Sequence, residues 1–255
     1  MRKKFLLMIF VLSLFTSMGG GWLHAQTENG VSKIGDTPYC SLSEALADAK
    51  TKNLSEVVIT IIGENTAATA DKFNLYQASV FNKVTFKQEN GNKPYYFEEL
   101  YTGSRTDNGQ FVFDGVNLVV TGQGQYIFEG NVVLSNNSLI KSTAEANCFV
   151  YYAEVTVEAG SKIDGVIEDI RGGSLIIDGG KTDGTYCEEP GLRDAILVVN
   201  WVNSNLVLRN GAYVNINAAN EIGRLTVNGT LDVANSKLES YQWIQVNENG
   251  TMKLK

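Results

Sequence analysis

Short stretches of alternating apolar and polar residues recur along the chain, and a glycine turn follows most of them. The clearest copies run over residues 155–163, 206–214, 225–233 and 244–252, with shorter echoes at 111–115, 126–130 and 176–179. Alternation with a period of two residues is typical of strands that bury one face. Each copy is interpreted as a strand, a tight corner and a second strand, because glycine adopts the positive φ that a tight corner requires.

The copies follow one another at a spacing of roughly 20 residues, which is typical of repeat architectures. A unit of this size cannot bury its own apolar face, so neighbouring units must stack and share a core. The pattern predicts an all-β fold, a right-handed parallel β-helix, with up to about ten rungs and a length of about 48 Å at about 4.8 Å per rung. An antiparallel β-sandwich, whose strands are joined by hairpins, is the alternative.

One segment has the periodicity of a helix. Ser41 and Glu44 have the spacing of a capping box, and apolar residues recur every three or four positions across residues 42–49. This pattern predicts a short helix before the strand 57–62. Because an open sheet edge invites aggregation, we expect the helix to cover the first rung, within an N-terminal cap of about residues 31–56.

The segment 31–46, followed by the predicted helix and the strand 57–62, resembles the N-terminal part of pectin-lyase-like right-handed parallel β-helix proteins, of the secreted and surface type found in gut bacteria. Residues 51–56 depart from that family, which usually has a short Gly-Asp turn before the first core strand. The resemblance implies the fold and no particular activity, because the family contains lyases, hydrolases, adhesins and structural shafts.

The N-terminus has the organisation of a secretory signal peptide. Arg2, Lys3 and Lys4 precede the apolar run 5–15, and small residues lead to Ala25. The run is shorter than the stretch of about 20 apolar residues that a membrane-spanning helix needs. We therefore expect a signal over residues 1–25 and a single β-helix domain over residues 26–255. The protein would be exported, and secreted, periplasmic or held at the cell surface.

The net charge argues against polyanionic partners. It is −7 for the whole chain, and it becomes more negative without the signal, because three of the 21 basic residues leave and all 28 acidic residues stay. Nucleic acids and anionic membrane surfaces are bound through clusters of Lys and Arg. The sequence therefore predicts no nucleic-acid partner, and it offers no second apolar stretch for an integral membrane protein.

The single histidine, His24, lies in the predicted signal. The exported part therefore lacks the imidazole that Ser-His-Asp and Cys-His catalysis and the usual zinc sites require. Cys40, Cys148 and Cys187 remain, an odd number at wide spacing. They allow one disulfide with one Cys left over, or some of them occupy small apolar positions in the core, and the second interpretation is favoured.

The densest acidic stretch contains Asp164, Glu168, Asp169, Asp178 and Asp183, with Arg171 among them. Pectin-lyase-like enzymes hold calcium with carboxylates and use Arg or Lys as base, so Asp164, Glu168, Asp169 and Arg171 are candidate ligand-binding residues. Trp201 is added to them as a platform for a sugar ring. They match no lyase or polygalacturonase motif, and a solvated charged face is the favoured alternative. No catalytic residue, metal ligand or cofactor is therefore assigned, and calcium is the one ion considered.

Two further groups are candidates. A set of aromatic residues would offer flat platforms for sugar rings, although strand aromatics more often fill a core; the set is Tyr151, Tyr152, Tyr186, Trp201 and Trp243. A charged group flanks Pro190 and predicts an excursion loop, and loops carry function more often than rungs do; its members are Glu188, Glu189, Arg193 and Asp194.

These observations favour an exported, non-catalytic solenoid with an adhesin-like or structural role. The alternative is a carbohydrate-active lyase or hydrolase, or a glycan-binding protein of the same fold. Expected partners are glycans or other cell-envelope proteins. The last predicted strands leave an edge that only Lys253 and Lys255 protect, so end-to-end self-association and a frayed, solvated edge both remain open.

Overall fold

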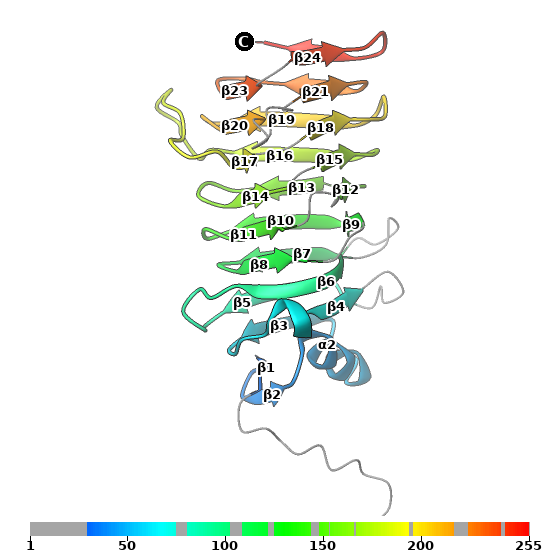
Figure 1. The fold of residues 1–255 in the computed structure, drawn as a ribbon, viewed down its shortest axis with the longest axis vertical. Helices are drawn as coiled ribbons and strands as arrows, with labels where there is room; N and C mark the ends of the chain where they lie inside the picture. The colour runs from blue at the N-terminus through cyan, green and yellow to red at the C-terminus, as the bar shows by residue number, and fades with distance from the viewer. Residues whose placement is uncertain are drawn as a thin grey trace, which may run out of the picture.

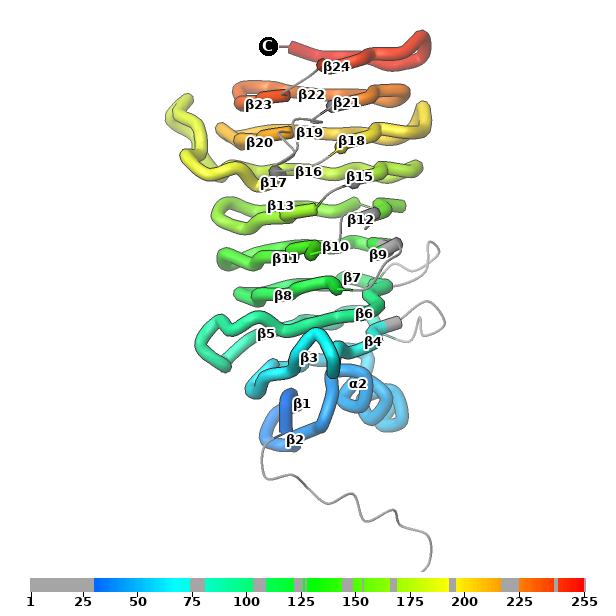
Figure 2. The backbone as a smooth tube through the Cα atoms, viewed as in Figure 1, coloured from blue at the N-terminus to red at the C-terminus, as the bar shows by residue number. Residues whose placement is uncertain are grey.

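The computed structural model describes residues 30–74, 81–102, 109–121, 125–143, 148–152, 154–165, 167–193, 196–216, 224–240 and 243–254. The chain forms a parallel β-solenoid of about seven turns. Most of the secondary structure consists of strands (52%). The turns stack along one axis, with the N-terminal elements at one end and β24 (Trp243–Val246) at the other (Figures 1 and 2). The predicted solenoid is confirmed, and the sandwich alternative is wrong. The predicted signal lies outside the described residues.

A regular turn of the coil places one strand on each of three faces, and strands of successive turns pair in parallel. The first face contains β3 (Glu56–Ile61), β5 (Lys83–Gln88), β7 (Gln110–Asp114), β10 (Asn131–Ser135), β13 (Glu154–Val157), β16 (Ser174–Asp178), β19 (Asn205–Arg209), β22 (Thr230–Asp232) and β25 (Thr251–Lys253). The second contains β8 (Asn117–Val120), β11 (Leu139–Ser142), β14 (Lys162–Asp164), β17 (Leu192–Arg193), β20 (Tyr213–Ile216) and β23 (Lys237–Ser240). The third contains β9 (Gln125–Phe128), β12 (Cys148–Tyr151), β15 (Ile167–Ile170), β18 (Ile196–Val199), β21 (Arg224–Val227) and β24.

One strand joins the second and third faces. β6 (Tyr95–Tyr101) pairs with β8 through its first three residues and with β9 through its last residue, and β4 (Asp71–Asn74) pairs with it from the preceding turn. The two faces therefore belong to a single 14-stranded sheet, whereas the first face belongs to a separate 11-stranded sheet.

Alternation along each strand selects the side chains that fill the coil. In β7, Phe111 and Phe113 are buried and Val112 between them is half-buried. The parallel register places Phe113 beside Leu134 of the next turn, and Leu134 beside Val157 of the turn after it. Inward positions therefore form continuous apolar columns along the axis, as the stacking argument requires.

The interior changes in composition along the axis. In the N-terminal half, aromatic rings pack against one another: Phe73 and Phe86 meet edge to face at 4.9 Å, and Phe128 stacks on Tyr151 at 5.3 Å between ring centroids. From β16 onward the buried apolar side chains are aliphatic. Edge-to-face and offset aromatic pairs stabilise a core beyond the area that they bury, so the N-terminal half contains these additional ring interactions.

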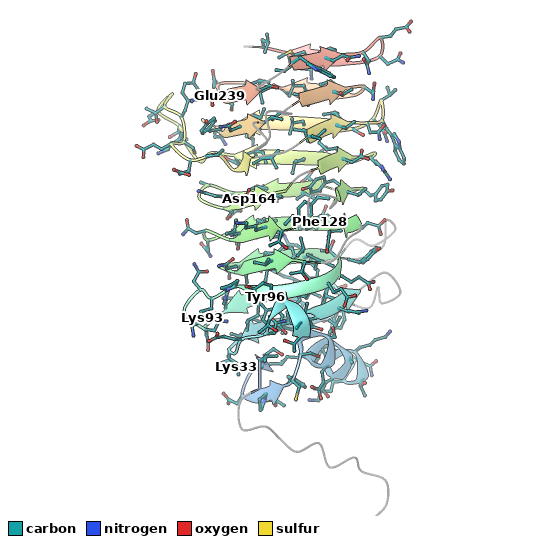
Figure 3. All side chains as sticks on the ribbon, viewed as in Figure 1. Lys33, Lys93, Tyr96, Phe128, Asp164 and Glu239 are labelled. Carbon is teal, nitrogen blue, oxygen red and sulfur yellow. The ribbon has the colours of Figure 1, made fainter. Side chains whose placement is uncertain are left out.

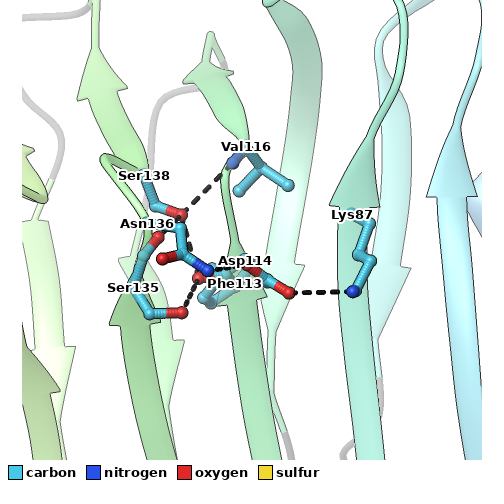
Figure 4. A network of polar contacts seen from close by, with 7 residues as sticks. All are labelled: Lys87, Phe113, Asp114, Val116, Ser135, Asn136 and Ser138. Atoms are coloured by element: carbon cyan, nitrogen blue, oxygen red, sulfur yellow. Dashed lines mark hydrogen bonds and ion pairs between the residues drawn. The ribbon is translucent and has the colours of Figure 1, made fainter.

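The corner between the first and second faces uses residues with positive φ. Gly115 and Gly160 have φ of 67° and 81°, and Asn136 has 54°, which glycine adopts without strain and asparagine tolerates. Figure 4 shows the contacts that join these corners: Asn136 donates to the carboxylate of Asp114, which also pairs with Lys87 Nζ at 3.2 Å. The hydrogen bond from Asn136 is the main reason that the pKa of Asp114 lies below its ordinary value, against the raising effect of burial.

Glycine also marks a second corner, which explains why about ten rungs were expected and about seven turns are present. Gly130, Gly229 and Gly250 immediately precede first-face strands, whereas Gly115 immediately follows β7 and Gly160 lies in the corner that follows β13. A Cβ at Gly229 would lie 2.2 Å from the Ser204 carbonyl oxygen, so this corner needs glycine for close approach. The sequence spacing mixed the two corners and therefore underestimated the length of a turn.

The spacing of residues in register gives the true length of a turn. Asp114 and Ser135 are in register, 21 residues apart, and Lys83 and Gln110 are in register, 27 residues apart. Asp178 and Arg209 are also in register, 31 residues apart, because a long loop is inserted between them.

The N-terminal cap contains the predicted helix and, in addition, a hairpin that the sequence did not predict. Helix α2 (Leu42–Thr51) buries its apolar stripe, and Ser41 Oγ caps it by accepting from the Glu44 N–H at 2.9 Å. The reciprocal bond of the predicted capping box is shifted by one residue, because the Glu44 carboxylate accepts from the Cys40 N–H at 2.8 Å and not from the N–H of Ser41. The antiparallel hairpin of β1 (Ser32–Ile34) and β2 (Thr37–Tyr39) extends the first face by pairing with β3. The short 3-10 helix η1 (Ala67–Thr69) precedes β4.

Asp71 attaches the helix to the first turns of the coil. Its carboxylate accepts from the Leu42 N–H at 2.7 Å, from Ser43 Oγ at 2.8 Å and from the Tyr95 hydroxyl at 3.2 Å. Burial raises the pKa of Tyr95, so its phenol remains a neutral donor.

We expect Asp71→Ala to lower the free energy of unfolding by about 1–3 kcal/mol, because the substitution removes a negative charge at a helix N-terminus and leaves buried donors unpaired. Urea unfolding followed by circular dichroism measures the change. Asp36→Ala, in the exposed turn of the hairpin, is the matched control and should have little effect. Equal stability of the two variants would contradict the anchoring role.

At the C-terminal end of the coil, side chains at inward positions are partly exposed to solvent. Ile244 and Val246 are in register with the buried Leu225 and Val227, yet they are 38% and 40% exposed. No further strand pairs with β24 on its outer side within the described residues. Self-association through this edge stays a prediction.

Candidate functional site

The acidic stretch singled out in the sequence is divided between two faces. Asp164 is the last residue of β14 on the second face (Figure 3), whereas Asp169 lies in β15 on the third face and Arg171 follows that strand. The backbone of Glu168 lies in register between Phe149 and Leu197, and its side chain is outside the described part of the structure. Of these four residues, the described contacts therefore join Asp169 and Arg171.

Asp169 and Arg171 form a nearly buried ion pair. Arg171 Nη2 lies 2.6 Å from Asp169 Oδ2, Arg171 Nε donates to the same oxygen at 2.7 Å, and Asn200 donates to Oδ1 at 3.0 Å. Arg171 Nη1 donates to the Tyr152 hydroxyl at 3.3 Å. The contact with Tyr152 and the pair with Asp169 raise the pKa of Arg171, although burial works in the opposite direction.

This arrangement is poorly suited to acid–base chemistry or to a metal ion. Both carboxylate oxygens of Asp169 already accept hydrogen bonds, and Asp169 is only 7% exposed. The guanidinium of Arg171, paired with this carboxylate, stays protonated. Nowhere among the described side chains do three or more His, Cys, Asp or Glu residues gather in a group that could hold a metal. Calcium binding stays a prediction for which these side chains offer no ligand set.

The candidate aromatic residues do not form one platform. Tyr151 is fully buried and belongs to the core. Trp201 lies in a tight turn after β18, 42% exposed, with its ring centroid 6.0 Å from that of Tyr152. Trp243, 40% exposed, begins β24, and Tyr186, 51% exposed, lies in the excursion loop. Tyr186 lines the cavity that is described below.

The predicted excursion loop is present between β16 and β17, over residues 179–191. Backbone hydrogen bonds attach both of its arms to the following turn of the coil: the Lys181 N–H donates to the Asn210 carbonyl and the Cys187 N–H to the Gly211 carbonyl, each at 2.8 Å. The Gly191 N–H donates to the Tyr213 carbonyl at 2.9 Å. The loop is therefore fixed to one neighbouring turn of the coil at several points.

On its other side the loop borders a cavity of about 770 Å³, which we call the loop groove. One wall is the corner after β13, and the other is the loop itself. The lining residues are Glu158, Ala159, Gly160, Ser161, Lys162, Ile177, Asp178, Gly179, Gly180, Lys181, Thr185, Tyr186, Cys187, Glu188, Glu189 and Gly191. The groove thus combines exposed peptide groups, hydroxyls, carboxylates and one aromatic ring.

Two of the four carboxylates of the loop groove are neutralised. Asp178 pairs with Arg209 at 2.8 Å, and Glu189 pairs with Lys162 at 3.0 Å. Burial works to raise the pKa of Asp178, but hydrogen bonds from Asn210, the Gly180 N–H and Arg209 hold it below its ordinary value. Glu158 and Glu188 have no ion-pair partner within the part of the chain that the structure describes.

The sequence located the loop but not its groove. Glu188 and Glu189 lie in the loop as predicted, the backbone of Arg193 already belongs to β17, and Asp194 is outside the described residues. The Gly179-Gly180 pair and the long gap before the next corner glycine were the available signals. Glu158 was missed because only the fold places its corner opposite the loop.

The cysteines correct one expectation. Cys40 is exposed, and Cys187 is half-buried, with its Sγ donating to the Gly179 carbonyl at 3.3 Å. A position in the apolar core is therefore wrong for Cys40, which lies on the cap, and for Cys187, which lines the loop groove. The side chain of Cys148 is outside the described residues.

No family model matches the chain, and comparisons with curated proteins and with solved structures also found no match. Among the described residues, no helix is both long enough and apolar enough to cross a membrane.

Proposed function

We propose that the protein is an exported, non-catalytic β-solenoid of the pectin-lyase-like type, which acts at the cell surface or outside the cell as an adhesin-like or structural module. Its partners in this proposal are glycans or other cell-envelope proteins. End-to-end contact through the last strands is a further part of the proposal.

The observation that carries the proposal is the pairing of charged side chains between neighbouring turns. Asp114 pairs with Lys87 of the preceding turn, Asp178 pairs with Arg209 of the following turn, and Asp169 is saturated by Arg171 and Asn200. None of these three carboxylates is free to exchange a proton with a substrate, as a catalytic acid or base must be. Ion pairs between neighbouring turns are consistent with a structural role for the coil. Each exposed pair adds at most about 1 kcal/mol to the free energy of unfolding.

A glycan array probed with the purified exported protein, with and without calcium, tests the proposal. We expect retention of one or more glycans without their consumption. If calcium is required, retention should disappear with chelator and return with added calcium. Absence of binding on the array and to isolated cell envelopes would contradict the proposal.

We also expect no turnover of uronic-acid polymers at any pH, because Asp169 and Arg171 neutralise each other and the exported part has no histidine. Ultraviolet absorbance of unsaturated products, together with a reducing-sugar assay, measures turnover. A commercial pectate lyase is the positive control. Product that disappears in Asp169→Asn or Arg171→Gln would replace the proposal with the lyase alternative.

The loop groove favours glycan binding as the specific role within this proposal. It joins a cavity to the exposed aromatic ring of Tyr186. Sugar-binding sites need a flat apolar platform together with polar groups that fix orientation, and concave sites with few convergent polar groups are the usual form of ligand pockets.

A further inference from the structure

We infer that the loop groove binds a saccharide that carries no acid group, with an amine-bearing hexosamine chain as its preferred ligand. This inference rests on the proposed glycan-binding role and adds to it the location of the site and the chemical class of the ligand.

The groove is organised before any ligand arrives. Four backbone hydrogen bonds of 2.8–3.1 Å join the loop to the following turn; their donors are the N–H groups of Gly179, Lys181, Cys187 and Gly191. Within the loop, Asp183 accepts from the Thr185 N–H at 3.0 Å and from its hydroxyl at 2.6 Å. A site whose backbone is already ordered loses less entropy on binding.

The shape and lining of the groove fit a short saccharide chain. Its volume of about 770 Å³ lies within the range of ligand pockets, which is about 300–1,000 Å³. The ring of Tyr186 is half-exposed, and one face of a pyranose presents C–H groups that stack on such a ring. Gly160 and Gly180 line the groove and are exposed, so hydroxyls of the ligand can reach their peptide groups.

The charges of the groove select against acidic sugars. The pairs Asp178–Arg209 and Glu189–Lys162 each have no net charge. The other charged residues that line the groove are two acidic residues, Glu158 and Glu188, and one basic residue, Lys181. Glu158 lines the groove at the corner after β13 and Glu188 lines it on the loop, and both residues are exposed, so each wall contains an acidic residue. A uronate would meet like charges and gain no free cation beyond Lys181, whereas a protonated amine would gain two carboxylates.

Isothermal titration of the purified exported protein with three tetrasaccharides tests the inference, at mildly acidic pH and low salt. The probes are glucosamine, N-acetylglucosamine and galacturonic acid tetramers. We expect the glucosamine tetramer to bind tightest, the neutral tetramer more weakly and the acidic tetramer not measurably. Raising the salt concentration should reduce the advantage of the amine, because surface charges are screened.

Three variants locate the site. Tyr186→Ala should weaken binding of the glucosamine and neutral tetramers by about tenfold, whereas Trp201→Ala, a comparably exposed aromatic elsewhere, should not. The double variant Glu158→Gln, Glu188→Gln should bring the affinity for glucosamine down to that for the neutral sugar. These side chains lie at the surface, so circular dichroism should show an unchanged fold.

Several outcomes would overturn the inference. These are binding of the acidic tetramer at least as tight as that of glucosamine, absence of binding by all three probes, or loss of binding in Trp201→Ala but not in Tyr186→Ala. If the glycan array still retains ligands in those cases, the proposed function stands and only the groove assignment fails. If the glycan array and the cell-envelope assay also show no binding, the proposed function and the groove assignment both fail.

Discussion

Phe113→Ala is expected to lower the free energy of unfolding by about 3–5 kcal/mol, the cost of removing a large ring from a packed core. The ring is fully buried and contacts aromatic rings of the turns before and after its own: its centroid lies 5.9 Å from that of Phe86 and 6.5 Å from that of Phe128. The substitution therefore removes contacts between turns as well as contacts within one.

In a stacked array the stability depends on contacts between neighbouring units, so a weakened junction should also reduce cooperativity. We expect urea unfolding of Phe113→Ala to become broader than that of the native protein. Val112→Ala is the control, because Val112 lies on the same strand and is only half-buried. A loss below about 1 kcal/mol, or a loss no greater than in the control, would contradict an interior held by continuous columns.

Excision of the excursion loop is expected to abolish saccharide binding while preserving the solenoid. Residues 179–190 would be replaced by Asn-Gly-Ala, the sequence of residues 210–212 that turns the same corner one turn later. The register supports this exchange, because Asp178 pairs with Arg209 and Leu192 with Val214. The shortened corner would therefore meet its neighbours at the positions that the longer one now occupies.

The expected result has two parts. Circular dichroism and the melting temperature should stay close to those of the native chain, and titration with the glucosamine tetramer should give no signal. The single variant Tyr186→Ala separates the two effects if the excised protein does not fold. Binding that survives excision would place the ligand elsewhere on the coil, and binding unaffected in both variants would exclude the loop altogether.

Sequence reasoning succeeded where the signal was local. The helix 42–51 depends on a serine N-cap and an apolar stripe, which are formed within a single segment. Strand alternation around Val157 and Leu208 likewise predicted inward side chains, and both are buried. These features require no knowledge of which turn lies above or below, so the sequence was sufficient for them.

The prediction was less accurate where two different corners share one local pattern. Residues 155–163 and 206–214 pass from the first face to the second, whereas residues 225–233 and 244–252 pass from the third face to the first. Both corners join short alternating strands through glycine. They were therefore taken as one repeat, and the number of turns was overestimated.

The candidate site depended on contacts between distant residues. Asp164 and Asp169 are close in sequence, yet a corner places them on different faces. The loop groove joins Glu158 to a loop that is held by residues 209–213, and no local pattern reveals that neighbourhood. Individual residue types pointed to ligand binding, and only the stacking of turns determined which of them meet.

The order in which strands pair also has a consequence for how the chain can assemble in time. From β5 onward, each described strand pairs with a strand that precedes it in the sequence, on a base formed by α2 and the hairpin of β1 and β2. If the chain emerges with its N-terminus first, each new strand can pair at once with a strand that has already folded. No segment depends on the last residues of the chain for its pairing partner. Growth of the coil can keep pace with delivery, one turn at a time, which limits how long an apolar strand stays uncovered.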